Sequence, residues 1–225
     1  MIPYKLIRSR RKTVAIHITK DAGVEVRAPS KMPKTDIDKF VIEKEKWIEK
    51  HINLREHVNE NKIAFTLNYG DMVMFCGIEY PIRAKDGTHA GFDGECFYMS
   101  SNLTHDHIKN IIIKTYKILA YRIIKQKVGE YAKHMNLTPT SIRITNAKTR
   151  WGSCSGKNSI NFSWRLIMAD DDVIDYVVVH ELAHIKEHNH SPRFWKVVES
   201  VLTDYKNRQN KLKLLQKKLV VQNWD

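Results

Sequence analysis

The sequence predicts an α+β protein in which a β-rich N-terminal domain carrying one helix precedes a mainly helical domain with a small sheet. Short segments of alternating apolar and polar residues dominate the first third of the chain, whereas long segments with helical periodicity dominate the rest. A glycine-containing, polar stretch at residues 84–102 separates the two regions. We therefore expect an accessory domain over residues 1–100 and a second domain over residues 101–225.

The strands of the first domain are predicted from alternation and turn residues. Residues 13–19 and 23–29 alternate apolar and polar side chains on either side of a turn, which is typical of a hairpin. Residues 72–76 and 79–84 form two further short apolar segments joined by a glycine. The first domain is therefore expected to contain at least four strands.

Two long helices are predicted from periodicity. The first covers residues 34–57, with Thr35 as its N-cap. Its apolar face comprises Ile37, Phe40, Val41, Trp47, Ile48 and Ile52. The second covers residues 105–135 and is stopped by Pro139. Its core-facing side comprises Ile108, Ile111, Ile112, Leu119, Ile123 and Val128.

The second domain continues with two strands and two helices. Strands are expected at residues 141–147 and 159–166, on either side of the segment "KTRWGSCSGKN". A helix is expected at residues 171–186. Aspartates lie just before this segment and at its first positions, where negative charge suits the positive end of a helix dipole. Another helix is expected to run from Ser191 into the basic C-terminal part of the chain.

Composition and charge restrict the classes of protein that are possible. The chain has 225 residues and a formal net charge of +13, an excess that attracts polyanions. The charge is spread out, with dense runs at residues 5–12 and 206–218, so solvated faces are the simpler interpretation. No apolar run is long enough to span a membrane, and the charged N-terminus does not resemble a signal peptide. We expect no membrane association and a cytoplasmic location.

The three cysteines give no sign of a disulfide framework. Cys76, Cys96 and Cys154 are odd in number and far apart in the sequence. Without a secretory signal, reduced thiols are expected. The cysteines also lack the CxxC spacing of a structural zinc site.

The predicted helix at residues 171–186 is apolar on nearly every face, which is typical of a helix buried inside a domain. His180, Glu181 and His184 are its polar exceptions, and buried polar groups need partners. Histidines at positions i and i+4 lie one turn apart on one face, so both imidazoles can bind one metal ion. The HExxH pattern therefore predicts two zinc ligands, with Glu181 as the general base between them.

A catalytic zinc site needs a third protein ligand and an open position. His188 lies about 12 Å from His180 along a continuous helix that rises 1.5 Å per residue. Because zinc–nitrogen bonds measure about 2.0–2.1 Å, three histidines in a straight line cannot easily converge on one ion. We therefore favour His190 over His188 as the third ligand. A carboxylate on the next helix, from Glu199 or Asp204, is the alternative.

His190 can reach the metal only if the helix ends before it. Pro192 disfavours helical geometry at Ser191, and Asn189 tolerates the left-handed conformation that ends many helices. Ser191 and Pro192 also match the N-cap and first position of a new helix. We therefore expect His190 at a corner between two helices.

Several segments of the chain together resemble the YgjP-like zinc metallopeptidases, relatives of the SprT and WLM proteases. They are "RWGSCS" (150–155), "INFSWRL" (160–166), "DYVVVHELAHIKEHNHSPRFW" (175–195) and the N-terminal "RRKTVAIHI" and "VRAP". The resemblance covers nearly the whole chain. It implies a zincin-like catalytic domain with a central HExxH helix, a long packing helix and a small sheet. It also implies His180, His184 and His190 as zinc ligands and Glu181 as the base.

These observations predict a zinc-dependent hydrolase, and in the first place a metallopeptidase. Zinc would activate a water molecule and polarise the scissile carbonyl, while Glu181 accepts the proton of the water. Arg150, Trp151 and Gly152 are expected to contact the substrate, because a glycine at a strand edge permits close approach of a peptide backbone. The sequence does not choose among four candidates for the hydrogen-bond donor that stabilises the oxyanion. These candidates are His188, Arg193, Tyr176 and Arg150.

Three other functions are alternatives. A zinc-dependent phosphohydrolase acting on nucleotides would use the same metal, but the chain has no glycine-rich phosphate loop. A DNA-associated protease of protein–nucleic acid adducts would fit a basic surface by analogy with some relatives. A nucleic-acid-binding module with a structural metal fits poorly, since structural sites usually have four ligands. The expected partners are a peptide or protein substrate and, as the alternative, a polyanion or nucleic acid.

Overall fold

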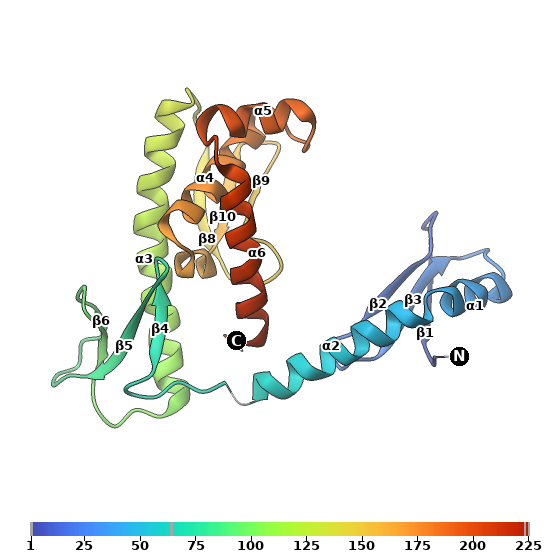
Figure 1. Cartoon of the computed structure of the whole chain (residues 1–225), viewed down its shortest axis with the longest axis horizontal. Helices are drawn as coiled ribbons and strands as arrows, with labels where there is room; N and C mark the ends of the chain where they lie inside the picture. The colour runs from blue at the N-terminus through green and yellow to red at the C-terminus, as the bar shows by residue number, and fades with distance from the viewer. Residues whose placement is uncertain (1, 64, 223, 225) are drawn as a thin grey trace. The chain divides into compact units, whose positions relative to one another are not determined.

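The computed structural model describes residues 2–63, 65–222 and 224, of which 58–63, 220 and 221 are described without their side chains. Figure 1 shows the helices and strands of the chain. The chain divides into two compact units. One comprises the residues up to Phe65 with a short stretch from Leu219, and the other comprises Thr66–Lys218 with Trp224.

The first unit contains a three-stranded sheet of β1 (Lys5–Ser9), β2 (Ala15–Ile18) and β3 (Val24–Pro29). β3 lies in the centre, parallel to β1 and antiparallel to β2. The antiparallel pairing of β2 and β3 confirms the predicted hairpin. Because alternate residues of a strand point to opposite faces, β3 presents one apolar face to the helices of this unit.

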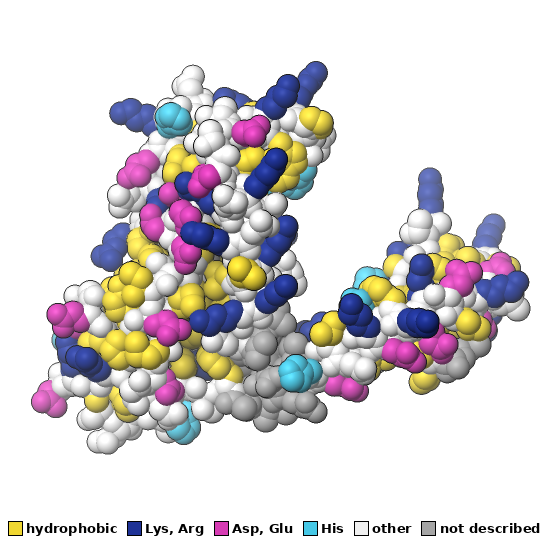
Figure 2. All heavy atoms as spheres, in the orientation of Figure 1, with side chains coloured by type: hydrophobic (Ala, Val, Ile, Leu, Met, Phe, Trp, Pro, Cys, Tyr) yellow, Lys and Arg dark blue, Asp and Glu magenta, His cyan; other side chains and the backbone are white. Residues whose placement is uncertain are grey.

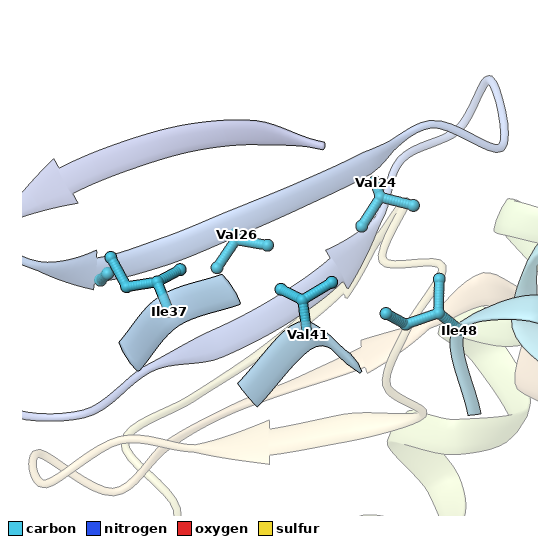
Figure 3. Close-up of a cluster of buried hydrophobic side chains, with 6 residues drawn as sticks. Val24, Val26, Ile37, Val41 and Ile48 are labelled. Atoms are coloured by element: carbon cyan, nitrogen blue, oxygen red, sulfur yellow. The ribbon is translucent and has the colours of Figure 1, made fainter. Parts of the chain in front are cut away.

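Two helices, α1 (Lys34–Glu43) and α2 (Glu45–Ile63), cover that face of the sheet. The core between them consists of small and branched apolar side chains, most of them fully buried (Figure 3). They are Val24, Val26, Ala28, Ile37, Val41 and Ile48. This core stabilises the first unit by removing apolar surface from water.

The single helix predicted over residues 34–57 is therefore wrong, because the helical run is interrupted at Lys44. Thr35 is not the N-cap. Pro33 takes that position with an extended ψ of 142° and no side-chain hydrogen bond. The prediction that Trp47 faces the core is also wrong, since its side chain is 44% exposed. Ile48 and Ile52 of α2 still face the core of this unit, as predicted.

A four-stranded sheet opens the second unit, in the order β4 (Met72–Phe75), β5 (Ile78–Ala84), β7 (Phe97–Met99) and β6 (Gly91–Phe92). β4 and β5 pair antiparallel and match the two predicted strands. β6 and β7 were not predicted. They lie inside the stretch of residues 84–102 that the sequence suggested to be a domain boundary.

This sheet packs against helical residues that follow it in the chain. The hydroxyl of Tyr116 donates a hydrogen bond to the backbone oxygen of Met74 at 2.6 Å. The backbone N–H of Cys76 donates to the backbone oxygen of Ile167 at 2.8 Å. These contacts join the sheet to the second unit, so the two units separate after residue 65 and not near the predicted position.

The helix α3 (His105–His134) matches its prediction and packs against a second sheet of the same unit. This sheet has the order β8 (Ser141–Thr145), β10 (Ser159–Ser163) and β9 (Gly152–Cys154). β8 runs parallel to β10, whereas β9 runs antiparallel to it. β9 is thus an edge strand, and it lies in the segment that the sequence assigned to a connection.

Three helices complete the second unit: α4 (Asp171–Lys186), α5 (Pro192–Val201) and α6 (Tyr205–Val221). α4 matches its prediction. The single helix expected from Ser191 onward is two helices, because Leu202 adopts an extended conformation with φ of −132°. The α+β class is confirmed. In the described part of the chain, no helix combines the length and apolarity needed to cross a membrane.

Candidate metal centre

The helix α4 carries the HExxH residues through the interior of the second unit. Its aspartates at the N-terminal end are held by lysines from other helices. Nζ of Lys127 lies 2.8 Å from the Asp171 carboxylate, and Nζ of Lys211 lies 2.8 Å from that of Asp172. The helix is buried on most sides, as predicted. Its buried apolar residues are Val173, Ile174, Tyr176, Val177, Val178, Val179, Leu182 and Ala183.

The side chains of His180, His184 and His190 meet at one point. Their candidate ligand atoms all lie within 4.8 Å of one another, and Nε2 of His180 is 3.0 Å from Nε2 of His190. Two nitrogen ligands of a tetrahedral zinc ion are about 3.3 Å apart when each bond measures about 2.0–2.1 Å. The cluster has the size of a zinc site. Among the described residues, it does not include the alternative ligands His188, Glu199 and Asp204.

His190 reaches the cluster from the corner between α4 and α5. α4 ends at Glu187, which is extended with φ of −134°. As predicted, Ser191 is the N-cap of α5 and Pro192 follows at its first turn. Asn189 does not adopt the left-handed conformation that it tolerates. The side-chain oxygen of Asn189 instead accepts a hydrogen bond from the backbone N–H of Ser191 at 3.2 Å, which helps to turn the chain.

Burial favours the neutral form of the two imidazoles on α4. It lowers the pKa of His180 to about 3, with further contributions from His184 and His190. It also lowers the pKa of His184. Nδ1 of His184 lies 3.1 Å from the backbone oxygen of Glu187, and a hydrogen atom on Nδ1 leaves the lone pair on Nε2. A neutral imidazole with a free lone pair is the form that binds a metal.

Glu181 lies beside the cluster with a side chain that is 5% exposed. Its Oε2 atom has no hydrogen-bond partner among the described residues. Burial raises the pKa of this carboxyl to about 8, against the opposing charge of Arg150. An unpartnered buried carboxyl is costly unless a cation or a water molecule satisfies it. Neutral imidazoles next to such a carboxyl are a donor set that fits zinc.

The strand β9 packs against α4 at the position of Glu181. A Cβ atom added to Gly152 would lie 2.5 Å from Oε1 of Glu181 and 2.6 Å from its Cγ. The sequence linked Gly152 to the approach of a substrate, whereas in the structure its missing side chain makes room for Glu181. Trp151 is half-buried and Arg150 is exposed. The three residues predicted to contact substrate thus lie on β9 or directly before it, next to the cluster.

Two aromatic side chains of α5 surround the histidines. The ring centroid of the buried Phe194 lies 4.9, 4.5 and 4.8 Å from those of His180, His184 and His190. Trp195 stacks on His190 with centroids 5.8 Å apart. Neither aromatic was predicted to contact the histidines. The sequence feature that could have indicated these contacts is the position of both aromatics in the first turn of α5, directly after His190.

Comparisons with known proteins identify a family and two similar solved structures. A family model described as "YgjP-like, metallopeptidase domain" matches residues 12–214. No curated protein matches the chain. One similar solved structure is the metallopeptidase zymogen of Pyrococcus abyssi abylysin, with 22% identity, a TM-score of 0.37 and coverage of 40% of this chain and 90% of that one. Another is the metallopeptidase zymogen of Methanocaldococcus jannaschii jannalysin, with 26% identity, a TM-score of 0.36 and coverage of 42% and 95%.

The two structural likenesses cover less than half of this chain and have low TM-scores, so the assignment rests on the family match. That match extends over most of the sequence and includes the HExxH helix, the corner with His190 and the strand β9. The chain belongs to the YgjP-like metallopeptidase family.

Proposed function

We propose that the chain is a zinc-dependent peptidase in which His180, His184 and His190 hold the metal and Glu181 is the general base. The observation that carries this proposal is the meeting of three imidazoles beside a buried carboxyl that lacks a partner among the described residues. When bound, zinc would activate a water molecule and polarise the carbonyl of the scissile peptide bond.

Glu181 is suited to move a proton in this site. Burial raises the pKa of its carboxyl, so the carboxylate holds a proton more strongly than that of an exposed glutamate. Its carboxyl can accept a proton from water and donate it to the leaving amine. Contact with Gly152 on β9 limits where the carboxyl can lie, and Arg150 opposes a further rise in its pKa.

The edge strand β9 offers a place for an extended peptide. The backbone oxygen of Trp151 accepts a hydrogen bond from the N–H of Ser163 at 2.8 Å, so Trp151 faces β10. Because hydrogen-bonding directions alternate along a strand, Gly152 and Cys154 turn their backbone groups to the outer edge. A substrate strand could pair there by β-augmentation. We therefore propose a peptide or protein substrate that contacts Arg150, Trp151 and Gly152.

We propose that the second unit is the peptidase domain and that the first is an accessory domain. Three free cysteines support a reducing, cytoplasmic location. On the face shown in Figure 2, Lys and Arg side chains are scattered among acidic and apolar ones. This distribution gives no support to nucleotide hydrolysis or to a protease of nucleic-acid adducts.

The proposal is tested with Glu181→Gln and a matched control, Glu199→Gln, which changes an exposed carboxylate of α5. Zinc content is measured together with hydrolysis of an unfolded protein and of nucleoside triphosphates. We expect about one zinc per chain in all three proteins. Glu181→Gln should lose about 100-fold or more of the proteolytic rate, as expected for a general base, and Glu199→Gln should not. A wild-type chain without zinc, or full proteolysis by Glu181→Gln, would contradict the proposal.

A further inference from the structure

We propose that the C-terminal helix α6 positions two of the metal-binding histidines through Tyr205 and Gln209, so that residues far from the histidine motif help to set the metal affinity. The inference rests on the proposed function, because it takes His180 and His190 as ligands. Tyr205 and Gln209 lie four residues apart and therefore on one face of α6. Each begins a chain of contacts within the second unit that ends at a histidine.

The first chain runs from Gln209 through Tyr176 to His180. Tyr176 precedes His180 by one turn of α4, and its side chain is 3% exposed. The Tyr176 hydroxyl oxygen lies 3.5 Å from Nδ1 of His180 and accepts a hydrogen bond from Nε2 of Gln209 at 3.4 Å. A histidine that binds a metal through Nε2 carries its hydrogen on Nδ1 and needs an acceptor there.

Tyr176 can serve as that acceptor only if its ring keeps its position. Gln209 holds the hydroxyl from the side of α6, while burial holds the ring. This use of the hydroxyl also argues against Tyr176 as a donor to the oxyanion, because the group is buried and turned toward the histidine. Tyr176 is thus a positioning residue and Gln209 acts through it.

The second chain runs from Tyr205 through Trp195 to His190. Tyr205 stacks on Trp195 with centroids 5.4 Å apart and an interplanar angle of 18°. Trp195 stacks on His190 with centroids 5.8 Å apart and an angle of 29°. His190 is exposed and comes from a corner between helices, so its backbone does not restrict the ring as a helix does. The stack of Tyr205 and Trp195 on His190 restricts the orientation of the imidazole ring instead.

α6 is itself held to α4 on both sides of Gln209. Nη1 of Arg208 donates a hydrogen bond to the backbone oxygen of Asp172 at 3.0 Å. Nζ of Lys211 lies 2.8 Å from the carboxylate of the same aspartate. Because Asp172 and Tyr176 lie one turn apart on α4, these contacts fix the position of Gln209 relative to Tyr176.

Removing the group that holds the second ring nitrogen of a metal-bound histidine typically lowers metal affinity by about 10–100-fold. Tyr176→Phe removes the hydroxyl and keeps the ring, so zinc affinity should fall about tenfold, at the lower end of that range. Gln209→Met should have a smaller effect in the same direction. Tyr205→Leu should also weaken zinc binding. Tyr205→Phe should keep the zinc affinity of the wild type, because the stack on Trp195 requires only the ring.

The experiment measures the zinc affinity of the full chain by competition with a chromophoric chelator. The visible spectrum of the cobalt-substituted protein reports the ligand geometry independently of activity. Gln216→Met is the matched control, since it makes the same change on α6 about two turns further along. It should bind zinc and cobalt as the wild type does. Thermal unfolding of the metal-free proteins detects any general loss of stability.

A double variant separates positioning from a merely structural role. If Gln209 acts through Tyr176, Tyr176→Phe combined with Gln209→Met should bind zinc as weakly as Tyr176→Phe alone. Additive losses would overturn this chain of contacts. Should Tyr205→Leu fail to fold, Tyr176→Phe and Gln209→Met still decide the outcome, because both keep side-chain size.

Two failures can be told apart. If the wild type binds about one zinc and Tyr176→Phe, Gln209→Met and Tyr205→Leu all keep its affinity and cobalt spectrum, the role of α6 is overturned and the proposed function stands. If the wild type binds no zinc, the proposed function itself is overturned. Lower stability of the metal-free variants with unchanged zinc affinity would also overturn the positioning role.

Discussion

Replacement of Gly152 by alanine tests whether β9 and the proposed base, Glu181, form one packed contact. The new Cβ atom would lie 2.5, 2.6 and 2.7 Å from Oε1, Cγ and Cδ of Glu181. Comfortable separations between non-bonded carbon atoms are about 3.5–4.0 Å, so the carboxyl or the strand must move by about 1 Å. A displacement of that size at a reacting group can cost about 100-fold in rate. We therefore expect kcat/KM to fall by about 100-fold.

Zinc should stay bound in this variant, because the three atoms nearest to the new methyl group all belong to Glu181 and not to a histidine. Overpacking should also cost about 1–3 kcal/mol of stability. The assay compares peptide hydrolysis, zinc content and thermal unfolding with those of Gly156→Ala. Gly156 lies in the turn after β9, and a Cβ atom there meets nothing within 4 Å. Wild-type kcat/KM in a folded Gly152→Ala protein would refute the reasoning.

Other predictions concern the third ligand, metal binding, acid stability and the core of the first unit. Equilibrium dialysis should show that His190→Ala loses zinc and His188→Ala keeps it; the reverse would exclude His190. Zinc at 1,000 times its Kd should stabilise the wild type by about 4 kcal/mol in denaturant unfolding, and equal stabilisation of His190→Ala would count against the site. The Tyr4 hydroxyl donates to Asp38 and is the main reason that the pKa of this carboxyl lies below 3.8. Because the folded pKa is the lower one, this stabilisation is present above pH 3.8 and is lost as the pH falls through the folded pKa. Tyr4→Phe should thus flatten the acid-unfolding profile of the first unit, and an unchanged profile would contradict this. Ile37→Ala should cost that unit about 2–5 kcal/mol in urea unfolding, and a loss below about 1 kcal/mol would mean that its core is loosely packed.

The parts of the fold that could be predicted are those whose signal is local. The hairpin of β2 and β3 and the helices α3 and α4 each contain enough residues to show a period. β6 and β7 contain too few residues for alternation to be visible. The glycines around them suggested a linker. Gly87 and Gly94 instead adopt φ values of 107° and 101° at turns that connect strands of a sheet.

Helix breaks were missed for a related reason. Neither Lys44 nor Leu202 is a residue type that ends helices, yet α1 ends at the first and α5 at the second. Because the residue type does not mark the end of either helix, propensity predicts neither break. Trp47 is 44% exposed although its neighbour Ile48 and Ile52 face the core as predicted, so the error concerns the width of the apolar face and not the helical period.

In the candidate site, too, the features with a local sequence signal could be predicted and the others could not. The meeting of its three histidines could be predicted because His180 and His184 lie one turn apart on a helix and because Ser191 and Pro192 mark where the chain turns at His190. Part of what holds these groups comes from distant segments, Gly152 on β9 and Gln209 on α6, and left no pattern in the sequence. Gly152 was linked to a substrate because the sequence does not show that Glu181 lies against it.

The HExxH motif and its supporting contacts can therefore vary separately. A chain could keep HExxH and the third histidine and still lose the shape of the site through a side chain at position 152 or a changed partner of Tyr176. The motif indicates which chemistry is possible, and the packing decides whether the groups lie where that chemistry needs them. Gly152 lies against Glu181, and Gln209 donates a hydrogen bond to Tyr176. Substitutions at these two positions keep all three histidines, so they separate packing from metal binding more cleanly than any change to a histidine.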